Sequence, residues 1–87
     1  MVSYMIEPAQ IRAARALISW KQIDLAKASG VSEISIKNIE RGTTDPRSST
    51  LGALISALDK AGVLFLNDAE AGPGVRLKRQ LKKATKR

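Results

Sequence analysis

Residues 22–41 read QIDLAKASGVSEISIKNIER and predict two helices joined by a tight turn. The apolar positions of residues 22–29 indicate a short first helix. Gly30 follows it, where a helix often ends in a left-handed residue. Ser32 is a suitable N-cap for a second helix over residues 33–41. A short helix, a turn with glycine and a second helix together form a helix-turn-helix.

The second of these helices, which Gly42 ends, has two unlike faces. At about 100° per residue, Ile36, Ile39 and Glu40 fall on one arc, which we expect to anchor the helix. The opposite arc is polar and cationic apart from one isoleucine. It consists of Glu33, Ile34, Lys37, Asn38 and Arg41. A helix with such a face, presented by a neutral scaffold, suits the major groove of DNA.

Two further helices flank this unit. One is expected from Pro8 to about Ser19, because proline fits a first helical turn and the following apolar residues repeat at helical spacing. The other is expected after Thr50, a possible N-cap, and ends before Gly62. Its apolar positions are Leu51, Leu54, Ile55 and Leu58. Residues 43–49 between the helices are expected to form a loop.

The C-terminal part predicts a small hairpin and a basic tail. Residues 63–66 (VLFL) and residues 75–77 (VRL) have strand character, and a loop with Gly72-Pro73-Gly74 is expected between them. The predicted fold is therefore mainly α, with four to five helices and a small C-terminal β-hairpin. We expect a DNA-binding domain over residues 1–62, a hairpin over 63–77 and a disordered tail over 78–87.

The charge of the chain is concentrated at its C-terminal end. Fifteen Lys and Arg against eight Asp and Glu give a net charge of +7. Residues 1–73 hold eight basic and all eight acidic side chains, so they sum to zero, and residues 74–87 hold seven basic ones. The tail residues expected to contact phosphates are Lys78, Arg79, Lys82 and Lys83. Each phosphate neutralised should add about 0.9 to the slope of log affinity against log salt.

Several residue types are missing, and their absence excludes functions. The chain has no cysteine and no histidine, which removes the commonest metal ligands and the commonest general base. We therefore predict no catalytic residue, no metal site, no cofactor and no enzyme.

No apolar run reaches the roughly 18 residues of a membrane span, and the N-terminus lacks the pattern of a signal peptide. A cytoplasmic protein without membrane association is expected.

Several spaced residues resemble the Xre/Cro/C1-type helix-turn-helix repressors. The matching motifs are Gln22-x-x-Leu25-Ala26-x-x-x-Gly30-Val31-Ser32, Ile36-x-x-Ile39-Glu40-Arg41-Gly42, and Pro46 with Thr50-Leu51. The resemblance covers about residues 8–62, and residues 72–77 resemble a hairpin found after this domain in some bacterial members. It implies a repressor-like fold in a bacterial or phage regulator that is nucleoid-associated and binds double-stranded DNA.

The resemblance also implies roles for individual residues. Together with the exposed arc, it predicts four residues that read base edges, namely Glu33, Ile34, Lys37 and Asn38. It predicts contacts with the DNA backbone from Gln22, Ser32, Arg41, Thr43, Thr44 and Arg47. The position of Gln22 also braces the recognition helix in relatives. Arg15 and Glu40 match a buried ion pair that links the first and third helices.

Some residues keep two interpretations. Glu33 either accepts a hydrogen bond from a cytosine amino group or only favours the helix dipole. Ile34 either contacts a thymine methyl group or lies in the core of a slightly rotated helix. Trp20 packs at the corner between the first two helices or stacks on a base.

The leading functional hypothesis is that the protein is a sequence-specific transcriptional regulator, and the resemblance implies a repressor. One alternative is an antitoxin-like autoregulator with a protein partner, and another is a helix-turn-helix interaction module that does not bind DNA. The polar and cationic residues Lys37, Asn38 and Arg41 argue against the last. A homodimer is expected, because residues 63–77 carry more apolar surface than an isolated hairpin can bury.

Overall fold

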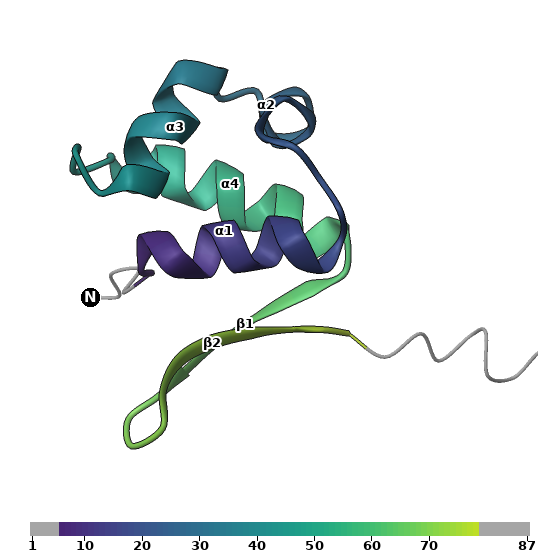
Figure 1. Cartoon of the computed structure of the whole chain (residues 1–87), viewed down its shortest axis with the longest axis vertical. Helices are drawn as coiled ribbons and strands as arrows, with labels where there is room; N and C mark the ends of the chain where they lie inside the picture. The colour runs from purple at the N-terminus through teal and green to yellow at the C-terminus, as the bar shows by residue number, and fades with distance from the viewer. Residues whose placement is uncertain (1–5, 79–87) are drawn as a thin grey trace, which may run out of the picture.

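The computed structural model describes residues 6–78, which form four helices and one antiparallel hairpin. The helices are α1 (Pro8–Leu17), α2 (Gln22–Ser29), α3 (Glu33–Arg41) and α4 (Ser48–Lys60), and the strands are β1 (Val63–Asp68) and β2 (Gly72–Leu77). Figure 1 shows α1 and α4 between the α2–α3 unit and the hairpin. The predicted fold class is confirmed. Among residues 6–78, no helix combines the length and the apolar character that a membrane span requires.

The core collects the apolar faces of all four helices. Its buried side chains are Ile11, Ala14, Leu25, Ile36, Ile39, Leu54, Ala57, Leu58 and Val63. Those of α1, α3 and α4 recur at helical spacing, so the periodicity of the sequence already marked the buried faces of these helices. Ile18 and Trp20 are partly buried against this core, and Trp20 lies at the corner between α1 and α2.

The helix-turn-helix boundaries agree with the prediction. Gly30 (φ 81°) and Gly42 (φ 75°) both adopt the left-handed conformation that ends α2 and α3, which glycine adopts without steric cost. The hydroxyl oxygen of Ser32 accepts a hydrogen bond from the backbone N–H of Ser35 at 3.1 Å, so Ser32 is the N-cap of α3.

The predicted start of α4 was wrong by three residues. Arg47 is the N-cap, with extended backbone, and its carbonyl accepts the first helical hydrogen bond from Leu51 N at 3.0 Å. Thr50 therefore lies within the first turn instead of capping it. The cap preference of Thr50 did not decide the boundary, because the extended backbone of Arg47 already supplies the cap geometry without a side-chain bond.

The hairpin is longer than predicted, because residues expected in its loop are paired. Asp68 lies opposite Gly72 and Leu66 opposite Gly74. Lys78 N donates to Gly62 O at 2.8 Å, and hydrogen-bonded and non-hydrogen-bonded pairs alternate from there. Pro73, opposite Asn67, consequently occupies a non-hydrogen-bonded position, where its missing N–H costs no ladder bond.

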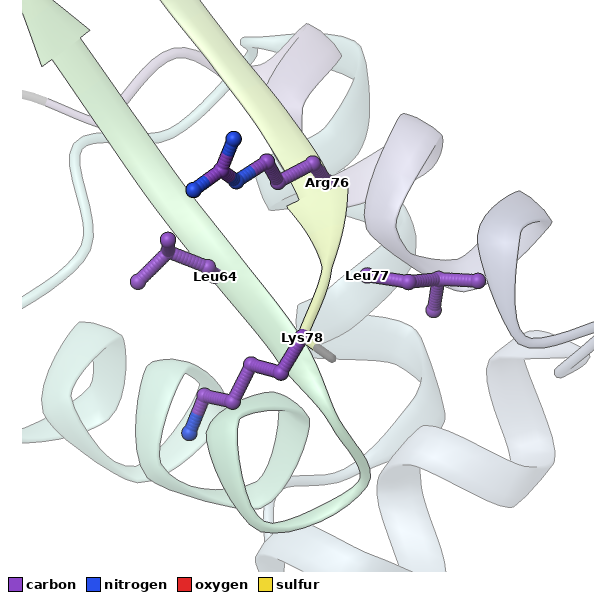
Figure 2. Close-up of a pocket in the computed structure, with 4 residues that line it drawn as sticks. All are labelled: Leu64, Arg76, Leu77 and Lys78. Atoms are coloured by element: carbon purple, nitrogen blue, oxygen red, sulfur yellow. The ribbon is translucent and has the colours of Figure 1, made fainter. Parts of the chain in front are cut away.

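One face of the hairpin packs on the helices. Val63 is fully buried, and Phe65 and Val75, which lie opposite each other, are half-buried against the core. Figure 2 shows Leu64 and Arg76 pointing away from Leu77, which is on the helix side of the strands. The hairpin thus buries part of its own apolar surface within the same chain.

Gln10 of α1 fastens the hairpin to the helices. Its side-chain nitrogen donates to Leu66 O at 3.1 Å and to Gly74 O at 3.0 Å. Its side-chain oxygen accepts from the backbone N–H of Glu7 at 2.8 Å, at the start of α1. Gln10 is 4% exposed, and these three bonds satisfy its buried amide.

Candidate nucleic-acid interface

The outward face of α3 is the face that the sequence predicted. Ile36, Ile39 and Glu40 are buried, whereas Lys37 and Arg41, as well as Ile34, are exposed. Glu33 and Asn38 are half-buried at the edges of this exposed face. Ile34 is 70% exposed, so its interpretation as a core residue is wrong.

An ion pair holds α3 against α1. Arg15 contacts both carboxylate oxygens of Glu40, with Nε 2.7 Å from Oε2 and Nη2 2.8 Å from Oε1. This bidentate geometry fixes both the distance and the orientation of the two helices. The hydrogen bond from Arg15 to Glu40 raises the pKa of Arg15 above its ordinary value, and the guanidinium stays charged. The pair that the resemblance implied is therefore present.

Two further side chains reinforce this contact. Gln22 Nε2 donates to Glu40 Oε1 at 3.0 Å, so the start of α2 braces α3 as the resemblance implied. Arg12 Nη1 donates to the backbone carbonyl oxygen of Glu40, close to the end of α3. Arg12 was not predicted as a site residue. Its position three residues before Arg15, on the same side of α1, was the available signal.

These residues surround a depression between α1, α2 and α3. It is lined by Arg12, Arg15, Gln22, Lys37, Glu40 and Arg41. The carboxylate of Glu40 is buried beneath Arg15 and Gln22, whereas Arg12, Lys37 and Arg41 are exposed. The accessible part of the depression is therefore cationic, which suits a phosphate backbone.

The other side of α3 meets the loop before α4. Thr43 donates to Asn38 O from both its backbone N–H and its hydroxyl group, each at 3.1 Å. Thr44 and Asn38 line a second depression along α3. Thr43, Thr44 and Arg47 are exposed, so this loop extends the polar surface that begins on α3.

Two further predicted contact residues, Ser32 and Lys78, also have partners within the chain. The Ser32 hydroxyl group caps α3 and also bonds the Ser35 hydroxyl group at 2.9 Å. Lys78 Nζ lies 2.6 Å from Asp59 Oδ1 at the end of α4. The predicted tail contacts Arg79, Lys82 and Lys83 lie outside the described residues.

Comparison with known proteins agrees with this geometry. A protein-family model described as helix-turn-helix matches residues 11–64, which include all four helices from the second turn of α1 onward. No curated protein matches the chain. The family match spans more than half of the chain and includes the Arg15–Glu40 pair and the exposed face of α3. The chain belongs to the Xre/Cro/C1-type helix-turn-helix family of DNA-binding regulators.

Proposed function

We propose that the protein is a transcriptional repressor that reads operator half-sites by inserting α3 into the major groove. The observation that carries the proposal is that one side of α3 is buried in the domain and the other side is exposed. Buried Ile36, Ile39 and Glu40 anchor one side of the helix, and the opposite side exposes Ile34 and Lys37 without any covering element among residues 6–78. A domain bound in this way would exclude other proteins from the same DNA.

The side chains around α3 separate into two kinds of contact. Lys37 can donate to guanine O6 and N7, and Asn38 can pair with adenine N6 and N7, so these two are assigned to bases together with Glu33 and Ile34. The Asn38 amide oxygen lies 3.5 Å from Arg41 Nη2, at the limit of a hydrogen bond, so base pairing would break only a weak contact.

The surrounding basic, amide and hydroxyl side chains are assigned to phosphates. They are Arg12, Gln22, Arg41, Thr43, Thr44 and Arg47. Contacts of this kind position a protein on the duplex and carry no sequence information. Substituting them should therefore weaken binding to all sequences alike.

Substitution of the reading residues tests this proposal. A preferred site is first selected from a random DNA pool, and binding is then measured by fluorescence anisotropy. Asn38→Ala should cost about 1–3 kcal/mol on the preferred site and much less on random DNA. Gln22→Ala should weaken binding to both DNAs more evenly.

Lys60→Ala is the control, because Lys60 is an exposed lysine at the end of α4 and outside the α3 face. If Lys37→Ala and Asn38→Ala bind the preferred site as tightly as the wild type, α3 is not the reading helix.

We also propose that the protein binds DNA as a homodimer through the exposed apolar side chains of the hairpin. Leu66 is 36% and Leu77 52% exposed, which leaves apolar surface that the chain does not cover among residues 6–78. The hairpin lies across α1 and α4 from the α2–α3 unit (Figure 1), so a partner there leaves α3 free. Two recognition helices about 34–36 Å apart would then meet successive major grooves. Sedimentation of a monomer at high concentration, with one protein per operator, would contradict the dimer.

A further inference from the structure

We propose that the first turn of α3 selects a pyrimidine 5-methyl group that lies beside an exocyclic amino group. In this proposal, Ile34 packs on the methyl group and Glu33 accepts a hydrogen bond from the amino group. The inference rests on the proposed DNA-reading role of α3, and it names the base chemistry that this turn recognises.

Ile34 is the first observation. At 70% exposure it has the largest exposed fraction of the exposed large apolar side chains among residues 6–78. Ile36 on the same helix is fully buried, and the two side chains are about 200° apart, so no rotation of α3 buries both. A β-branched side chain is stiff in a helix and offers a fixed apolar surface. The one apolar group on a base edge in the major groove is the 5-methyl group.

Glu33 is the second observation. Its side chain makes no hydrogen bond or ion pair with any residue that the structure describes between positions 6 and 78, although it is half-buried at the start of α3. A carboxylate only accepts hydrogen bonds, and phosphates repel it. In the major groove, the amino groups of cytosine and adenine are the donors on base edges that can compensate for this repulsion. Lys37, one turn further along α3, contributes an opposite charge on the same face.

The two residues are neighbours, which constrains the target. Their Cα atoms are about 3.8 Å apart, close to the rise of about 3.4 Å between successive bases on one strand. The methyl group and the amine can therefore belong to a thymine and an adjacent base. They can also belong to a single 5-methylcytosine, which carries both groups on one edge. The shared chemistry is a 5-methyl group next to an amino group.

Base analogues in the selected site distinguish these sources. Replacing thymine by uracil removes only the methyl group, and replacing cytosine by 5-methylcytosine adds only that group. If the methyl group comes from thymine, one uracil substitution in a single half-site should weaken wild-type binding about fourfold, equivalent to about 0.8 kcal/mol for one buried methyl-sized group. If it comes from 5-methylcytosine, methylation of one cytosine should strengthen binding by a similar factor.

Variants of the full chain connect the effect to the two residues. Ile34→Ala should abolish the response to the methyl group, whereas Ile34→Val should keep most of it. Ile23→Ala is the matched control, because Ile23 is also a partly exposed isoleucine but lies on α2, and it should respond as the wild type does. Glu33→Gln, which can donate as well as accept, should tolerate other bases at the neighbouring position.

The outcomes separate this inference from the proposed function. If Asn38→Ala weakens site binding but neither base analogue changes wild-type affinity, α3 reads DNA and the methyl-reading inference is wrong. The inference is also wrong if the methyl response persists in Ile34→Ala. If no preferred sequence can be selected, both proposals are overturned.

Discussion

Helix α3 and the hairpin are both fastened to α1, but by different chemistry. On one side, Arg15 and Arg12 hold α3 through the carboxylate and the backbone carbonyl of Glu40. On the other side, the neutral amide of Gln10 holds Leu66 and Gly74 of the hairpin. Helix α1 is therefore the common base of two attachments, one charged and one uncharged.

The surroundings of each attachment explain why one is charged and the other is neutral. The charged attachment borders the cationic depression at the face of α3, where arginine side chains can also meet phosphates. The attachment through Gln10 is buried, and a neutral amide costs less to desolvate than an ion. Helix α3 is therefore oriented by groups that also line the cationic depression, whereas the hairpin is held by a purely internal contact.

Of the substitutions that test the two attachments, Glu40→Ala should lower the stability of the fold the most. It would remove the partner of Arg15 from a position that is 3% exposed, and breaking a buried pair in this way costs about 3–5 kcal/mol of unfolding free energy. The lower end is expected, because the Arg15 side chain is 18% exposed and can reach water. Urea denaturation measures the loss.

Asp59→Ala is the matched control, since it removes the exposed Lys78–Asp59 pair at 2.6 Å. Exposed pairs contribute about 0–1 kcal/mol. If both variants lose the same stability, the Arg15–Glu40 contact is not the attachment that holds α3.

The attachment of α3 could be anticipated from the sequence, because its signals are local or match a known family motif. The local signals lie within a few residues of one another: the turn glycines, the N-cap Ser32 and the buried isoleucines of α3. Arg15 and Glu40 were identified only through the resemblance. Neither periodicity nor charge alone pairs residues that are 25 positions apart.

The attachment of the hairpin could not be anticipated in the same way. Gln10 bonds backbone carbonyls 56 and 64 positions away, and backbone groups leave no mark on the residue type. Pro73 misled the strand prediction for a related reason. Whether a proline fits within a strand depends on which side of the ladder its nitrogen faces, and this is set by the register with β1.

Gln10→Ala should have the second-largest effect, and it should be confined to the hairpin. The variant would lose both donors to the strands as well as the acceptor for Glu7 N, and unmade buried hydrogen bonds cost about 1–3 kcal/mol. Hydrogen–deuterium exchange should accelerate in β1 and β2, while exchange in α3 should change little.

The comparison variant is Gln22→Ala, which removes a single bond to Glu40 and leaves the strands untouched. It should accelerate exchange in α3 instead. Equal acceleration of the hairpin in both variants would show that the two attachments are not independent.

Asp68→Ala should have the smallest effect, because Asp68 is fully exposed at the tip of the hairpin. Its carboxylate accepts hydrogen bonds from the backbone N–H groups of Ala71 and Glu70, both at 2.7 Å, and these bonds lower the pKa of Asp68 below its ordinary value of 3.8. A lowered pKa in the folded state means that the contribution to stability is present above pH 3.8 and is lost as the pH falls through the lowered value. The wild type should therefore have a slightly higher thermal midpoint than Asp68→Ala at neutral pH, and the two should converge in acid.

Asp68→Asn keeps a neutral acceptor at the same place and should show a weaker dependence on pH than the wild type. A difference between the wild type and Asp68→Ala that stays constant into acid would mean that the charge of Asp68 does not support the turn.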